Sequence, residues 1–138
     1  MERTGVVYHL TNTPMLTVNI KTTQMELTPA IRAYAENKVR MIERLLDERD
    51  SDPFVQIELG ETTQHHQSGN IFRVELNLST GRGKTRVEVE KDDLYAAIDT
   101  AKDSLVDELQ RNKNKETHML RRGARMMKNV LRSIGFGE

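Results

Sequence analysis

The sequence predicts an α+β fold, a two-layer sandwich in which one four-stranded sheet carries two helices on a single face. Four segments alternate apolar and polar residues with a period of two, as strands with one solvated face do. Two segments repeat apolar residues every three or four positions, as amphipathic helices do. The elements follow in the order β-α-β-β-β-α, and a sheet with a single apolar face can bury that face under both helices.

Composition indicates one domain with extensions at both ends. The chain has 138 residues, enough for one core, and no cysteine, which excludes disulfides and thiolate chemistry. No segment has the apolar run of a membrane span, so we expect a cytoplasmic protein. Charges balance at 21 basic and 21 acidic residues, yet residues 116–138 carry five basic and two acidic side chains. We therefore divide the chain into a flexible leader (1–14), a domain (15–115) and a basic amphipathic arm (116–138).

The first strand and the first helix have clear signals. Leu16, Val18 and Ile20 alternate with polar residues, which predicts a strand. Thr28 offers a hydroxyl cap and Pro29 suits the first helical turn. The helix should end before Asp50–Pro53, since proline cannot continue it. Its expected buried residues are Ile31, Ala35, Val39, Ile42, Leu45 and Leu46.

Three more strands follow, around Val55–Leu59, Phe72–Leu78 and Thr85–Val89. The first two strands of the sheet are joined by a helix, and such a crossover usually makes them parallel. The link Thr80–Gly83 holds two glycines that can take positive φ, so the last two strands should form a tight antiparallel hairpin.

The last core helix starts at Asp92 and Asp93, whose carboxylates can cap free backbone N–H groups. We expect it to end near Arg111, followed by a polar break at 112–115. A third helical pattern then runs from Leu120 to Ile134 and should form fully only against a surface, partly because Gly123 costs about 1 kcal/mol relative to alanine.

No residue set indicates catalysis or metal binding. His65 and His66 are adjacent, so their side chains point apart in an extended chain, and no ligand of suitable spacing is near. Gly81–Lys84 resembles a phosphate cradle but links two strands instead of opening a helix. We therefore expect no enzyme, no cofactor, no metal and no small-molecule substrate.

Two basic groups allow more than one interpretation. Arg82, Lys84 and Arg86 would either protect a sheet edge from strand pairing or contact phosphate. The arm could contact RNA phosphates, an anionic membrane or an acidic protein, or pack back on the domain. The residue pattern does not choose among these.

Two motifs carry a family resemblance. The segments TQMELTPAIR (residues 23–32) and DLYAAID (93–99), in this element order, resemble the ribosome hibernation promoting factor and ribosome-associated inhibitor A family. The resemblance implies a fold like a double-stranded-RNA-binding domain. It also implies a translation inhibitor, active under stress, that binds the small ribosomal subunit in the tRNA and mRNA channel and stabilises idle ribosomes.

The resemblance implies 16S rRNA and ribosomal proteins as partners and no membrane. We expect a monomer off the ribosome, because residues after the domain are too few for a further dimerisation domain. The alternative function is a protein-interaction module that modulates an alternative sigma factor. The expected rRNA-binding residues are Lys38, Arg82, Lys84, Arg86, Lys91, Arg111, Lys113, Lys115, Arg121, Arg122 and Arg125.

Overall fold

The computed structural model describes residues 15–63 and 69–134. The expected leader (1–14) and the pair His65 and His66 lie outside these residues. The elements are β1 (Thr17–Thr23), α1 (Pro29–Arg40), the 3-10 helix η1 (Met41–Leu45), β2 (Phe54–Thr63), β3 (Asn70–Thr80), β4 (Gly83–Lys91) and α2 (Leu94–Ser133). This confirms the predicted β-α-β-β-β-α order.

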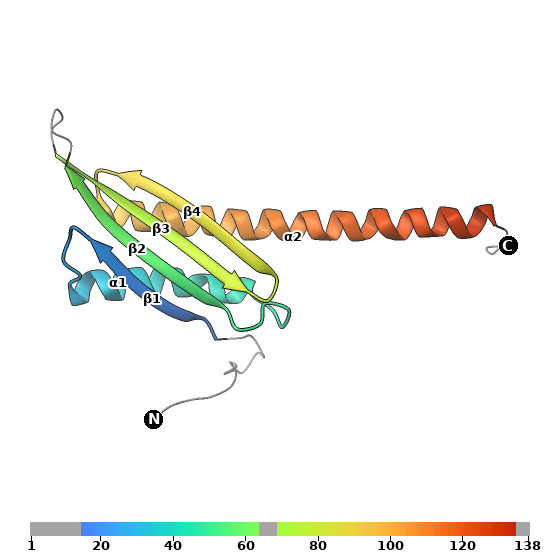
Figure 1. Ribbon diagram of the computed structural model, residues 1–138, viewed down its shortest axis with the longest axis horizontal. Coiled ribbons are helices and arrows are strands. Elements are labelled where there is room, and N and C mark those ends of the chain that lie inside the picture. The colour runs from blue at the N-terminus through green and yellow to red at the C-terminus, as the bar shows by residue number, and fades with distance from the viewer. Residues whose placement is uncertain (1–14, 64–68, 135–138) are drawn as a thin grey trace, which may run out of the picture. The chain divides into compact units, whose positions relative to one another are not determined.

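The strands form one sheet in the order β1-β2-β3-β4 (Figure 1). β1 and β2 are parallel, whereas β2–β3 and β3–β4 are antiparallel, as predicted. The register places Val55 opposite Leu78 and Ile57 opposite Leu76. Apolar side chains of neighbouring strands thus share one face of the sheet, because side chains alternate along each strand.

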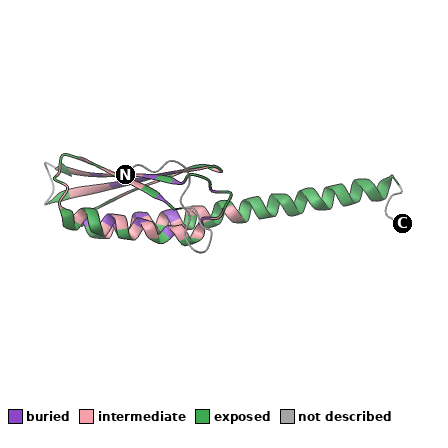
Figure 2. Cartoon of the chain, turned by 90° about the horizontal axis from the view of Figure 1, so that it is seen from below, coloured by how far each residue is buried: buried purple, intermediate pink, exposed green. Residues whose placement is uncertain are grey.

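Both helices lie against that apolar face, and their buried residues point toward it (Figure 2). The other face is left to solvent, so the predicted two-layer architecture is confirmed. The most completely buried side chains come from α1, η1, β2, β3 and the first turns of α2. They include Ala35, Val39, Ile42, Val55, Ile57, Val74, Leu76, Ala97, Ile98 and Leu105.

The helix starts match the sequence signals. The Thr28 hydroxyl accepts a hydrogen bond from the Ile31 amide at 3.2 Å, and Asp93 accepts one from the Tyr95 amide at 3.0 Å. The first helix was predicted as a single α-helix, but after Arg40 it tightens into η1. Short 3-10 turns are common at helix C-termini. Here Arg40 donates to the Leu16 carbonyl and Glu43 accepts from the Leu16 amide, at 2.8 and 2.9 Å.

The β3–β4 turn uses its two glycines for different reasons. Gly83 has a φ of +139°, in the region that favours glycine. Gly81 does not have positive φ, which corrects the prediction for that residue. It needs space instead, since a Cβ there would lie 3.2 Å from the Arg49 carbonyl oxygen and crowd Ser51. The turn therefore packs closely on the segment that follows η1.

The predicted break at 112–115 is wrong, because α2 is helical from Leu94 to Ser133. Residues 112–115 contain neither glycine nor proline, and asparagine costs less than about 1 kcal/mol relative to alanine. A helix already nucleated by a packed segment gains one hydrogen bond per added residue, so it also passes Gly123. The chain nevertheless divides into two compact units after Val106.

Within residues 15–63 and 69–134, no helix is long and apolar enough to cross a membrane.

Replacing the buried Ile98 by aspartate should unfold the first unit, because an unpaired carboxylate in the core costs several kcal/mol. Circular dichroism and thermal melting should show loss of the cooperative transition. The matched control is Gln110→Asp at an exposed position of the same helix, which should melt like the parent. A normal melt for Ile98→Asp would mean that this helix face is not in the core.

Candidate nucleic-acid interface

The corner residue Arg82 is held by acidic neighbours. Its guanidinium lies 3.9 Å from a carboxylate oxygen of Asp47 and 3.8 Å from one of Asp50. Asp50 is buried and also accepts hydrogen bonds from the Asp47 amide at 2.9 Å and the Thr80 hydroxyl at 3.3 Å. Arg82 thus ties the β3–β4 turn to the segment after η1, a role beyond the two considered from the sequence.

Arg86 takes part in a charged network on the solvent face of the sheet. Glu75, only 8% exposed, pairs with both Arg86 and Arg73 and accepts a hydrogen bond from Asn77. Glu88 pairs with the same two arginines. Two carboxylates and two guanidinium groups on adjacent strands therefore neutralise one another.

This network shifts ionisation on both sides. The hydrogen bond from Arg86 holds the pKa of Glu75 below its ordinary value, against the opposing effect of burial. The hydrogen bond from Arg73 likewise lowers the pKa of Glu88. Both arginines have raised pKa values for the same reason. The carboxylates are thus ionised at neutral pH, and the network is structural.

Other expected contact residues are also engaged within the chain. Lys38 lies 3.4 Å from Asp99 and 5.5 Å from the centre of the Tyr34 ring. Tyr34 donates to Asp99 at 2.7 Å, and this carboxylate raises the pKa of the phenol. Arg111 donates to both carboxylate oxygens of Glu108 at 2.8 Å.

Lys84 and Lys91 are exposed and form no ion pair with a described residue. They lie at opposite ends of β4, opposite Ser79 and Phe72. Seven positions apart on a strand, they also face opposite sides of the sheet. The structure therefore does not bring them together.

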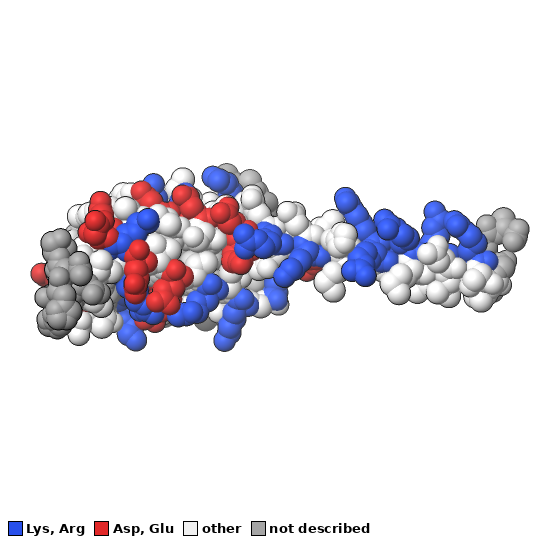
Figure 3. Space-filling model, turned by 90° about the horizontal axis from the view of Figure 1, so that it is seen from above, with Lys and Arg blue, Asp and Glu red and all other residues white. Residues whose placement is uncertain are grey.

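The arm gathers cations most clearly. Arg121, Arg125, Lys128 and Arg132 follow at steps of four, three and four, which places them on one stripe of α2. Arg122 lies beside this stripe, and Lys115 lies one to two turns before it. All six are exposed, and Figure 3 shows Lys and Arg side chains along one side of the segment. Lys128 and Arg132 were not among the expected contact residues, although the helical spacing alone would have found them.

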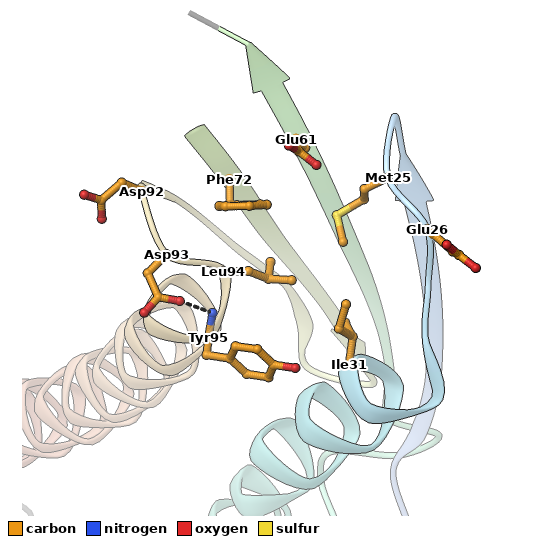
Figure 4. A pocket seen from close by; sticks show the side chains of 9 residues that line it. All are labelled: Met25, Glu26, Ile31, Glu61, Phe72, Asp92, Asp93, Leu94 and Tyr95. Atoms are coloured by element: carbon orange, nitrogen blue, oxygen red, sulfur yellow. Dashed lines mark hydrogen bonds between the residues drawn. The ribbon is translucent and has the colours of Figure 1, made fainter. Parts of the chain in front are cut away.

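An acidic region lies elsewhere in the first unit. Met25, Ile31, Phe72 and Leu94 converge on an open hollow of about 410 Å³ (Figure 4). Glu26, Glu61, Asp92 and Asp93 also line it, and the side chains of Glu26 and Asp92 point outward at its rim (Figure 4). None of these four pairs with a lysine or arginine within the described residues. Such a surface repels phosphate.

The fold has counterparts in known proteins. Residues 18–117 match the family described as sigma 54 modulation protein / S30EA ribosomal protein. The chain belongs to this family. The match ends before the cationic stripe at 121–132. The stripe is therefore an addition to the part that family members share.

Individual relatives agree with this family. A ribosome hibernation promoting factor of Azotobacter vinelandii is 31% identical over 99 residues, which cover 72% of this chain and 84% of the relative. Ribosome-associated factor Y of Haemophilus influenzae is 29% identical over 100 residues, covering 72% and 85%. The crystal structure of the N-terminal domain of Thermus thermophilus Protein Y superposes with a TM-score of 0.54 at 30% identity, covering 70% of this chain and 93% of that domain.

The Glu75 network predicts acid sensitivity. Because the pKa of Glu75 is lowered on folding, its contribution to stability is present above the ordinary glutamate pKa of 4.5 and is lost as pH falls through the folded-state value. The melting temperature should therefore drop between about pH 5 and pH 3. Glu75→Gln should lower the melting temperature at pH 7 and flatten this acid dependence. Glu48→Gln, at an exposed position, should do neither.

Proposed function

We propose that this protein is a ribosome-associated hibernation factor, a translation inhibitor that stabilises idle ribosomes in the cytoplasm. Its partner is the small ribosomal subunit, and its site is the channel that tRNA and mRNA otherwise occupy. Family membership and the names of the relatives support ribosome association. Binding of this kind needs no catalytic residue.

The observation that carries the proposed rRNA contact is the exposed stripe Arg121, Arg125, Lys128 and Arg132. Counterion release on phosphate contact is largest for cations that nearby acids do not neutralise. No described acidic residue pairs with these four side chains. Successive turns of the helix present them along about 16 Å. The arm thus offers a linear set of phosphate contacts.

The cations of the domain play a second part in this proposal. Lys84, Lys91 and Lys115 are exposed and available for single phosphate contacts. Arginine has five N–H donors in a fixed plane, so Arg82, Arg86 and Arg111 can keep their carboxylate partners and still donate to phosphate. Lys38 and Lys113 complete the expected surface.

The hollow also supports the second function considered, binding of a protein partner. Apolar side chains flanked by acidic residues suit a protein segment that carries both apolar and basic residues. The description of the family names sigma 54 modulation, which is an activity of that type. Salt dependence separates the two functions, since phosphate contacts weaken steeply with salt and a packed apolar interface does not.

Co-sedimentation with purified small subunits across a salt series tests the rRNA contact. Changing Arg121, Arg125, Lys128 and Arg132 to glutamine should weaken pelleting and make the logarithmic salt slope shallower by about 3, at 0.7 to 0.9 per lost contact. The melting temperature should stay unchanged, because all four side chains are exposed.

The matched control changes exposed cations outside the expected surface, Lys21, Arg32 and Arg44, to glutamine. This variant should pellet like the parent. An equal loss in both variants would indicate that only net charge matters. An unchanged slope in the arm variant would exclude the stripe as a phosphate-binding surface, and pelleting with the large subunit alone would refute the proposed partner.

A further inference from the structure

The arm also carries an exposed apolar face that phosphate binding leaves unused. Seven large apolar side chains are 42 to 68% exposed: Met119, Leu120, Met126, Met127, Val130, Leu131 and Ile134. Figure 3 shows uncharged side chains along one side of this segment. Monomeric soluble proteins rarely expose contiguous apolar patches of more than a few hundred Å², and larger ones mark interaction sites.

The spacing of this face indicates helix pairing. Leu120, Ala124, Met127, Leu131 and Ile134 follow at steps of four, three, four and three, the repeat that forms the seam of a coiled coil. At 100° per residue, the cationic stripe is centred about 110° around the helix from these positions. Two such helices can therefore join their apolar faces while Arg125 and Arg132 stay in solvent and Arg121 and Lys128 flank the seam.

We propose that a second copy of this chain covers the apolar face, through an antiparallel pair of arm helices. In this arrangement Leu120 lies opposite Leu131 of the partner copy, and Ala124 lies opposite the partner's Met127. A small side chain then meets a long, flexible one, whereas a parallel pair would set alanine against alanine and leave a gap. Antiparallel helices also oppose their dipoles.

Other coverings fit the residues less well. Nucleic acid can neutralise the basic face but offers the apolar face little to pack on. A helix that lies in a membrane interface usually carries several tryptophan or phenylalanine residues, whereas the arm contains no tryptophan and a single phenylalanine, Phe136. A second copy supplies an apolar face of matching length and spacing.

The size of the seam predicts a weak dimer. Two faces of this length bury on the order of 1,000 Å² in total, near the lower limit for specific interfaces. The protein should be monomeric at about 1 μM and largely dimeric at a few hundred μM. Because salt screens the repulsion between cations that flank the seam and strengthens apolar burial, the dimer should persist or strengthen at high salt, unlike phosphate binding.

Sedimentation equilibrium of the full chain, at low and at high salt, tests this dimer. The variant Met127→Glu with Leu131→Glu should remain monomeric at every concentration, since both residues lie in the seam. The control variant Arg122→Gln with Arg125→Gln, on the side of the helix away from the seam, should dimerise like the parent. Circular dichroism should show the same helix content in all three proteins.

Cysteine cross-linking tests the orientation, because the chain has no native cysteine. Leu120→Cys and Leu131→Cys should form a disulfide-linked dimer when the two variants are mixed and oxidised, and neither should do so alone. Cross-linking of each variant with itself would indicate a parallel pair and overturn the proposed arrangement.

A monomer at all concentrations, or a dimer insensitive to Met127→Glu with Leu131→Glu, would refute the self-association. In the first case, loss of small-subunit pelleting in the glutamate variant would assign the apolar face to a ribosomal groove. Flotation of the parent with phosphatidylglycerol vesicles would assign it to a membrane. The dimer is measured without ribosomes, so failure to pellet would count against the proposed function and leave the dimer standing.

Discussion

The structure of the first unit depends on one constraint: a sheet with a single apolar face must be covered on that face. Val55, Ile57 and Leu76 are fully buried there, beneath α1 and the first turns of α2. The order of the strands and the parallel β1–β2 crossover are ways to place two helices on the same side. Because the second face stays in solvent, its side chains are free to form charged contacts across strands.

This constraint explains what the sequence could predict. Alternation at Phe72–Leu78 and Thr85–Val89 identifies strands and their buried faces without knowledge of the partner strand. The ion pairs of Arg86 depend instead on the register of β3 and β4. This register sets Glu75 opposite Glu88, so that Glu75 is the diagonal neighbour of Arg86 on the same face of the sheet. Periodicity along one strand contains no information on register, so the neutralised state of Arg86 could not be predicted, although the exposure of Lys84 could.

The end of α2 shows a second limit of sequence patterns. Residues 112–115 lack apolar positions, and this was interpreted as a break in the helix. A stretch without apolar residues shows only that it does not pack on a core. Whether it is helical depends on the free-energy cost of placing each residue in a helix, which is small for lysine and asparagine. The pattern therefore located the change from buried to exposed residues, near the boundary of the two units, and mistook it for a helix end.

The separation of charge and apolarity in the arm follows from the same physics. A helix that packs on a core needs one apolar stripe, and in α2 the buried positions end at Leu105. Beyond that point Leu120 and Leu131 are exposed, yet they recur at seam positions while the cations are kept off them. A helix with polar and apolar residues mixed at random would be equally stable and more soluble. Two distinct faces instead serve two surfaces at once, and the exposed apolar face carries a solubility cost that only a partner offsets.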